Sequence, residues 1–354
     1  MKKNILVVDD SALMRRVICD IINTDDIFEA NDVCKDGLEA YEKLKTTKYD
    51  CVLLDVNMPH MDGLQLLERL KKEHIRATVI MVSTLTTKDA DVTIKAMELG
   101  AIDFVTKPDN VLQAKGEDFK NQLLSIVSAV LKSGNTKMLF HKTPTTKPKL
   151  QQSSTMPRSK GGKKCVAIAS STGGPKALQS VIPYISKSID APIILVQHMP
   201  VGFTKSMAER LNELSELEVK EAQEGDKLEK GKVIIAKGGS HFEIVPCPDG
   251  SHKVHLGNQP PVGGLRPYAN YMYESLKNSK FDEITCVVLT GMGADGTEGI
   301  MSLRKDKKVH IISQSEDTCI VYGMPKAIAE TGCVDEVVPL DDVAPTIIKN
   351  VGVK

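Results

Sequence analysis

Polar side chains able to bind a cation and a phosphate follow short apolar segments in the first third of this chain. Asp9 and Asp10 end the first apolar segment, Asp55 ends the third, and Ser83 and Lys107 end two later ones. In an open parallel sheet, ligands bind at the carboxyl ends of the strands, so we expect these side chains in one pocket. Carboxylates suit Mg²⁺, and one carboxylate could accept a phosphoryl group, while a hydroxyl and an ammonium group could hold its oxygens.

A serine in a sharp turn is the second feature that could do chemistry. The sequence from Ala169 to Gly173 fits the pattern G-x-S-x-G, with Ala169 at the first glycine and Ser171 as nucleophile. Pro175 is suited to the first position of a helix, where free backbone N–H groups could stabilise an oxyanion. Taken alone, the same turn also fits a phosphate-binding loop or a simple helix cap.

Two further strand ends supply the partners that a nucleophilic serine needs. A serine hydroxyl needs an imidazole to take its proton and a carboxylate to fix the tautomer of that imidazole. His198 follows an apolar segment that ends at Gln197, and Asp295 lies in a glycine-rich segment after Thr290. We therefore predict that Ser171, His198 and Asp295 form a catalytic triad, although each residue alone also has an ordinary structural explanation in a turn.

The elements that must position the first group alternate along the chain. Short apolar segments alternate with amphipathic stretches, a pattern typical of a doubly wound parallel sheet. This predicts an N-terminal domain over residues 1–125, with its final helix reaching about residue 131. The predicted strands are 4–8, 28–33, 51–54, 78–82 and 102–105, and the predicted helices are 11–23, 36–46, 62–72, 86–98 and 111–131.

A change of composition separates this domain from the next. Thr, Pro, Lys, Ser and Gly dominate residues 132–163, a composition that cannot bury a core, and we predict a flexible linker there. The α/β pattern then resumes and predicts a second α/β domain over residues 164–354. Its predicted strands are 165–169, 193–197, 233–236, 285–289 and 310–312, and its predicted helices are 175–186, 203–214, 268–278 and 296–304.

Charge and cysteine usage exclude several classes of protein. The chain carries 46 basic and 46 acidic residues, so no net field draws it to nucleic acid or to an anionic membrane. Its eight cysteines are scattered without a CxxC pair, which favours a reducing compartment over a disulfide framework. The N-terminus does not resemble a signal peptide, and no apolar stretch is long enough to span a bilayer. We expect a cytoplasmic protein without direct membrane insertion and without a nucleic-acid partner.

With these motifs in place, residues 1–125 resemble a response-regulator receiver domain, a five-stranded flavodoxin-like fold. The resemblance implies that Asp55 accepts a phosphoryl group from a chemotaxis histidine kinase, and that Ser83 and Lys107 relay the change. It also implies that Phe104 is the aromatic switch residue. The implied Mg²⁺ ligands are Asp10, Asp55 and the backbone carbonyl of Asn57. The matching motifs are Asp9-Asp10, Asp55 with Met58-Pro59 and Asp62-Gly63, Met81-Val82-Ser83, and Val105-Thr106-Lys107-Pro108.

Residues beyond the linker resemble the CheB-type chemotaxis methylesterase family, so with the receiver the resemblance spans essentially the whole chain. The order Ser, His, Asp along the chain also differs from that of α/β-hydrolases, which excludes that fold as the template. The matching motifs are Ser170-Ser171-Thr172-Gly173-Gly174, Gln197-His198-Met199-Pro200, residues 236–241, residues 290–296, Gln314-Ser315-Glu316 and Val321-Tyr322-Gly323-Met324-Pro325.

The resemblance implies a serine hydrolase that removes γ-methyl esters from glutamates on the cytoplasmic helices of chemoreceptors and deamidates receptor glutamines. Ser171 would attack the carbonyl with His198 as base, and methanol or ammonia would leave without the help of a cofactor. Backbone amides near Thr172 and Gly173, with one from the Met292 loop, are the expected oxyanion donors. The unphosphorylated receiver is expected to pack over the triad and to block a bulky receptor helix until Asp55 is phosphorylated.

Some residues depart from the family pattern or remain open. Residues 267–270 replace a segment that usually begins Pro-Ser-Val, and we expect this to alter substrate contacts but not the triad. His241 and Arg266 are candidate pocket residues, with a turn or core role for His241 as the alternative. A receiver-gated DNA-binding regulator is disfavoured because no clustered basic face follows the linker. A nucleotide-binding module is disfavoured because the Ser171 turn lacks the P-loop lysine.

Overall fold

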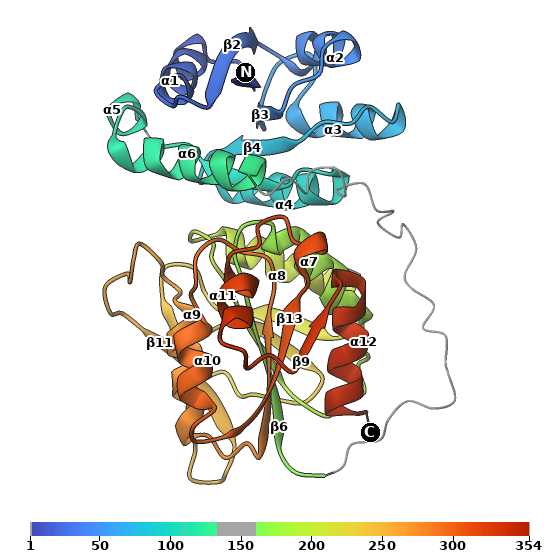
Figure 1. The fold of residues 1–354 in the computed structure, drawn as a ribbon, viewed down its shortest axis with the longest axis vertical. Coiled ribbons are helices and arrows are strands. Elements are labelled where there is room, and N and C mark those ends of the chain that lie inside the picture. The colour runs from blue at the N-terminus through green and yellow to red at the C-terminus, as the bar shows by residue number, and fades with distance from the viewer. Residues whose placement is uncertain (1, 109, 133–160, 354) are drawn as a thin grey trace. The chain divides into compact units, whose positions relative to one another are not determined.

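The computed structural model describes residues 2–108, 110–132 and 161–353 of the 354-residue chain (Figure 1). The chain divides into two compact units, residues 1–141 and 142–354, and each is described by itself. The predicted linker lies outside the described residues except for Lys132, which is the last residue of a helix, and residues 161–163. No helix in the described part of the chain is long and apolar enough to cross a bilayer.

The N-terminal unit contains the predicted five-stranded parallel sheet, with strand order β2-β1-β3-β4-β5. Every residue of β3 and β4 is buried, as expected for central strands covered by helices on both faces. Asp9, Asp55, Ser83 and Lys107 therefore lie at one edge of the sheet, each at or next to the end of a strand. The strands are β1 (Lys3–Val8), β2 (Phe28–Cys34), β3 (Cys51–Asp55), β4 (Val79–Ser83) and β5 (Asp103–Thr106).

Side-chain caps fix the starts of the helices in this unit. The side chains of Ser11, Asp36, Asp62 and Thr86 accept backbone N–H groups of α1 to α4, which stabilises the exposed first turns. The predicted single helix at 111–131 is wrong, because a turn at Gly116 separates two helices and glycine is a poor helix former. The helices are α1 (Ala12–Ile22), α2 (Gly37–Thr46), α3 (Gly63–Lys72), α4 (Thr87–Leu99), α5 (Val111–Ala114) and α6 (Glu117–Lys132).

The C-terminal unit contains a seven-stranded sheet with the order β14-β13-β12-β6-β7-β9-β8, in which all strand pairs are parallel. The central strands β6 and β7 are buried along their whole length, which places their carboxyl ends in the middle of one edge. The strands are β6 (Lys164–Ser170), β7 (Ile193–Gln197), β8 (Glu218–Glu221), β9 (Lys232–Ile235), β12 (Glu283–Val288), β13 (Lys308–Gln314) and β14 (Glu336–Val338).

Helices cover both faces of this sheet (Figure 1). One group consists of α7, α8 and α12, and the other of α9, α10 and α11, which bury Met272, Tyr273 and Ile300 against Ala167 and Ala169. The predicted helix at 175–186 ends early, because Pro183 has no N–H group to continue the helical hydrogen bonds. The helices are α7 (Gly174–Val181), α8 (Phe203–Leu214), α9 (Ala269–Ser275), α10 (Thr297–Leu303), α11 (Met324–Glu330) and α12 (Leu340–Val351).

Several elements were not predicted from the sequence. An antiparallel hairpin of β10 (His241–Pro246) and β11 (His252–Gly257) forms a small separate sheet and buries Phe242, Ile244 and Val254 in the core beside α9. The edge strands β8 and β14 and the last two helices, α11 and α12, were also missed. None of these elements carries a residue of the predicted triad.

Candidate functional site

Strand pairing in the C-terminal unit brings Ser171 and His198 next to each other. Ser170 and Gln197 are paired residues at the ends of the parallel strands β6 and β7, and the backbone N–H of His198 donates to the carbonyl of Ser170 at 3.1 Å. Neighbouring strands lie about 4.8 Å apart. The next residues along the two strands, Ser171 and His198, are therefore neighbours at the carboxyl edge of the sheet.

Two serines are adjacent in this turn, and their environments differ. Ser170 is fully buried and its hydroxyl donates to Oε1 of Gln197 at 2.7 Å. Ser171 is partly exposed, and its backbone is fixed by hydrogen bonds to Thr290 (3.0 Å) and from Nε2 of Gln197 (2.9 Å). The side chain of Ser171 can therefore meet a substrate, whereas that of Ser170 holds the turn.

His198 lies between this turn and Asp295. The imidazole is almost fully buried, and its Nε2 lies 2.7 Å from Oδ2 of Asp295. Its Nδ1 is buried and has no hydrogen-bond partner within the described residues. If Asp295 accepts a proton from Nε2, the lone pair of the imidazole is on Nδ1, which is the nitrogen that could act as a base.

Asp295 is held by the first turn of α9. Its Oδ2 accepts the backbone N–H of Ala269 at 2.6 Å, and its Oδ1 accepts that of Asn270 at 3.0 Å. Hydrogen bonds from backbone N–H groups stabilise the ionised form of a carboxylate, which is the form that can orient an imidazole. The three predicted residues are thus carried by the ends of β6 and β7 and by the loop after β12.

Residues 267–270 also contact the predicted triad, which we did not predict. The backbone N–H groups of Ala269 and Asn270 donate to Asp295, so the segment holds this carboxylate while the contact of Asp295 with His198 is kept. Asn270 also binds the backbone of the following turn through its side chain. Sequence reasoning missed this role because the two residues are about 25 positions from Asp295, and nothing in the pattern links them.

The loop after β12 packs closely against Ser171. Gly291 lies so near Ser171 that a Cβ atom there would be 2.8 Å from the Cβ of Ser171, and it would also clash with the sulfur of Met324. Only glycine allows this close approach. Met292, a predicted oxyanion donor, follows Gly291 and is 41% exposed, and Thr172 and Gly173, also predicted as donors, are buried in the turn after Ser171.

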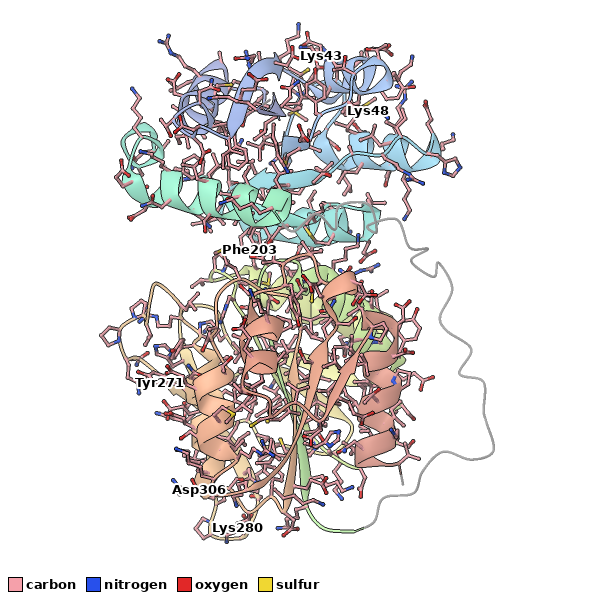
Figure 2. The ribbon with its side chains drawn as sticks, viewed as in Figure 1. Lys43, Lys48, Phe203, Tyr271, Lys280 and Asp306 are labelled. Carbon is pink, nitrogen blue, oxygen red and sulfur yellow. The ribbon has the colours of Figure 1, made fainter. Side chains whose placement is uncertain are left out.

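The two candidate pocket residues make contacts with other residues than the triad. His241 is fully buried at the start of β10, where its Nε2 lies 3.1 Å from the carbonyl of Pro260 and its ring packs edge-on against Tyr271. These contacts favour the core role that we left open. Arg266 donates to the carbonyl of Gln259 at 3.3 Å in an exposed loop. Tyr271, labelled in Figure 2, lies on α9.

Gln197 is a site residue that sequence reasoning missed. Its side chain joins both serines of the turn and also donates to the carbonyl of His198 at 3.2 Å. It is almost fully buried, so its polar groups must all be paired within the protein. The only available signal was a polar residue at the end of an otherwise apolar strand.

The N-terminal unit brings its predicted carboxylates together. Ligand atoms of Asp9, Asp10 and Asp55 lie within 4.8 Å of one another. Nζ of Lys107 lies 2.7 Å from Asp9 and 2.7 Å from Asp55, and all three of these side chains are nearly buried. Clustered carboxylate oxygens with one exposed member, Asp10, are a donor set that fits Mg²⁺.

Burial changes the titration of this cluster. Burial and, to a smaller extent, the neighbouring charge of Asp9 raise the pKa of Asp55 to about 6, against the opposing effect of Lys107. Burial lowers the pKa of Lys107, but Asp55 and Asp9 outweigh it and the net shift is upward. The lysine therefore stays charged between the two carboxylates.

Three other residues were predicted for the receiver site: Ser83, Asn57 and Phe104. The Ser83 hydroxyl accepts a hydrogen bond from Thr93 of α4 at 2.9 Å and donates to the carbonyl of Thr84 at 3.3 Å. The exposed Asn57 donates from Nδ2 to Asp89 at 2.6 Å, which directs its side chain to α4. Phe104 is buried within β5.

Comparisons with known proteins match both units of the chain. The family description "CheB methylesterase" matches residues 166–347, and "Response regulator receiver domain" matches residues 5–115. The chain is 40% identical to "Protein-glutamate methylesterase/protein-glutamine glutaminase 1" of Syntrophomonas wolfei over 98% of this chain and 99% of that one. It is 38% identical to a Bacillus subtilis protein of the same name without the number, over 97% of each chain.

A solved structure supports the fold of the C-terminal unit. The "Thermotoga maritima CheB methylesterase catalytic domain" is 38% identical, with a TM-score of 0.52, and the match covers 54% of this chain and all of that one. The C-terminal unit contains a seven-stranded sheet, and its residues 166–347 match the methylesterase family. Both findings disfavour the DNA-binding and the nucleotide-binding alternatives.

Proposed function

Because the chain belongs to the CheB methylesterase family and carries a receiver domain, we propose that it hydrolyses glutamate γ-methyl esters on chemoreceptors under the control of phosphorylation. The observation that carries the proposal is the contact between Asp295 and the imidazole of His198, at the end of the strand next to Ser171. The relatives are named for both methylesterase and glutaminase activity. The proposed substrates of this chain are glutamate esters and glutamines on cytoplasmic receptor helices.

In the proposed mechanism, Ser171 attacks the ester carbonyl carbon while His198 takes the proton of its hydroxyl. The ester C–O bond then breaks, methanol leaves with the proton from His198, and Ser171 remains acylated. Water attacks the acyl group with His198 again as base, which releases the receptor glutamate and restores the serine. A glutamine side chain would react by the same steps with ammonia as the leaving group, and no cofactor takes part.

The roles of the two imidazole nitrogens follow from their environments. Nε2 faces Asp295, so it carries the proton in the neutral ring and Nδ1 takes the proton of Ser171. This assignment is the reverse of that in chymotrypsin-type triads, where Nε2 faces the serine. Asp295 would stabilise the imidazolium that forms in each step.

The turn after Ser171 provides the proposed oxyanion site. Backbone N–H groups at Thr172 and Gly173, with one from the Met292 loop, would donate to the developing oxyanion. The fixed backbone of this region supports that role, because the hydroxyl of Thr290 donates to the carbonyl of Thr172 at 3.0 Å. Donors that are already held in place cost little reorganisation during the reaction.

The receiver pocket is the proposed input. Asp55 would accept a phosphoryl group from a histidine kinase, with Asp10, Asp55 and the carbonyl of Asn57 holding Mg²⁺. When bound, the cation would neutralise charge between the carboxylates and the phosphoryl oxygens. Lys107, whose Nζ lies 2.7 Å from both Asp9 and Asp55, would bind a phosphoryl oxygen, and Ser83 is the second expected contact.

Covalent labelling tests the nucleophile and its base. A fluorophosphonate probe should modify Ser171 in the wild-type chain, and peptide mapping by mass spectrometry would locate the adduct. His198→Ala should lose the adduct while the exposed-site control His255→Ala keeps it, since His255 lies on β11 away from the triad. An adduct on Ser170, or labelling that His198→Ala does not reduce, would refute the assignment.

A further inference from the structure

Asn270 lies in the first turn of α9 and is almost fully buried. Its side-chain oxygen accepts two backbone N–H groups, those of Gly296 at 3.0 Å and Gly299 at 2.7 Å. Its own backbone N–H donates to Oδ1 of Asp295 at 3.0 Å. One residue therefore binds Asp295 and also both ends of the turn that follows it.

The close approach at Gly299 shows how tightly this turn is docked. A Cβ atom at Gly299 would lie 2.8 Å from Cα of Asn270 and 2.8 Å from its carbonyl oxygen. The start of α10 is thus pressed against the start of α9, and the amide oxygen of Asn270 takes N–H groups that would otherwise be buried without a partner. Leaving such groups unpaired is costly.

The neutral side chain at this position matters for the chemistry. An aspartate could accept the same two N–H groups, but it would add a second negative charge beside Asp295. The Nδ2 group of Asn270 donates to the hydroxyl of Tyr268 at 2.8 Å, which fixes which end of the amide faces the turn. The other titratable groups near this point are His198, Glu298 in the first turn of α10, and the two tyrosines Tyr268 and Tyr273, both of which interact with Asp295.

We propose that Asn270 is a positioning residue for the hydrolysis, which aligns Asp295 with Nε2 of His198 while adding no charge to the pair. This inference rests on the proposed function. It assigns a role to residues 267–270, where this chain departs from the family pattern. The contact between Asp295 and His198 would then depend on the side-chain amide of Asn270 in α9.

The test compares three variants of the full chain with the wild type. Asn270→Ala removes the acceptor, Asn270→Asp keeps the acceptor but adds charge, and Tyr271→Phe is a control in the same helix. Two readouts are measured against pH: the rate of fluorophosphonate labelling of Ser171, and methanol release from a peptide that carries a glutamate γ-methyl ester. Melting temperatures are measured in parallel.

For Asn270→Ala we expect kcat to fall about 10- to 100-fold with little change in KM, as for a misplaced catalytic group. For Asn270→Asp we expect wild-type folding, with the rising limb of both pH profiles displaced by about 1 unit to higher pH. The added charge favours the imidazolium form, so a higher pH is needed to free the base. Tyr271→Phe should follow the wild-type profile.

The inference is overturned if the Asn270→Asp profile superimposes on that of the wild type, or if Asn270→Ala keeps its activity within twofold. Should Asn270→Ala fail to fold, the Asn270→Asp profile alone decides. The experiment distinguishes failure of the proposed function from failure of the inference on Asn270. Labelling that depends on Asn270 without methanol release would refute the substrate, whereas methanol release that is indifferent to Asn270 would refute only this inference.

Discussion

At the scale of single residues, the site depends on hydrogen bonds that fix the carboxylate of Asp295 and the turn that carries Ser171. Asp295 accepts Nε2 of His198 and two backbone N–H groups, so its carboxylate cannot rotate without losing a bond. Gln197 similarly fixes the turn that carries Ser171. The reactive geometry is therefore set by neighbours that take no part in the chemistry.

Replacing Asp295 by asparagine should damage catalysis far more than folding. The amide has only one acceptor atom, so it cannot hold both N–H groups of α9 and still accept from Nε2, and the imidazole loses its preferred tautomer. We expect kcat to fall about 10³- to 10⁴-fold, as in comparable triads. Methanol release from the ester peptide measures it, with the exposed Asp306→Asn as control (Figure 2). A loss below tenfold would argue against this role of Asp295.

The sequence predicts those site residues that lie at strand ends. Ser171, His198 and Asp55 could be placed because an apolar strand followed by a polar residue is a local pattern, and parallel strands bring such ends to one edge. The contact of Nε2 of His198 with Asp295 and the hydrogen bonds of Asn270 to the turn after Asp295 could not be predicted. Both depend on contacts between segments far apart in the sequence, and no local pattern encodes them.

At the scale of elements, all strands of the first sheet and the inner strands of the second were predicted, whereas the edge strands β8 and β14 of the second sheet were not. The strands β3 and β7 are continuous apolar segments, which is typical of the middle of a parallel sheet. The helix α12 was missed because Pro345 lies inside it, although Val343, Ile347 and Val351 form a buried stripe. The hairpin was missed because its strands begin with the polar residues His241 and His252, although both are buried.

His252 should make the stability of the C-terminal unit depend on pH. Burial lowers the pKa of His252, and three nearby lysines, Lys163, Lys280 and Lys307, lower it further. Its Nε2 accepts the backbone N–H of Lys280 at 2.9 Å, and its ring stacks on Phe281, so the folded state needs the neutral ring.

The sign of the effect follows from proton binding. Below the unfolded-state value of 6.5, the unfolded chain binds more protons at this histidine than the folded chain does. The free energy of unfolding should therefore decrease as the pH falls from 7 to 5. Urea unfolding at several pH values should show a smaller decrease for His252→Gln than for the wild type. The control His255→Gln, on the same strand but exposed, should keep the wild-type dependence; an unaltered dependence in His252→Gln would contradict the assignment.

At the scale of the whole molecule, the question is how a charge at one end of the first unit alters a reaction in the second. The pocket of Asp9, Asp55 and Lys107 balances two carboxylates against one ammonium group, so a phosphoryl group and a cation would change the local charge strongly. Such a change alters the second unit only if it shifts an equilibrium between states that differ in activity. A comparison of large and small reactants can show whether those states differ in access to Ser171.

Phosphorylation of Asp55 should accelerate the reaction of Ser171 with a large substrate more than its reaction with a small reagent, if access to Ser171 is what changes. The assay measures methanol release from a methylated receptor fragment and the rate of labelling by the small fluorophosphonate probe, each with and without acetyl phosphate and Mg²⁺. In Asp55→Ala the ratio of the two rates should be one for both substrates, because no acceptor carboxylate remains, whereas the exposed Asp20→Ala should behave as the wild type. Equal stimulation of both substrates would show that phosphorylation changes the triad itself rather than access to it. Stimulation that survives in Asp55→Ala would mean that the phosphoryl group acts elsewhere.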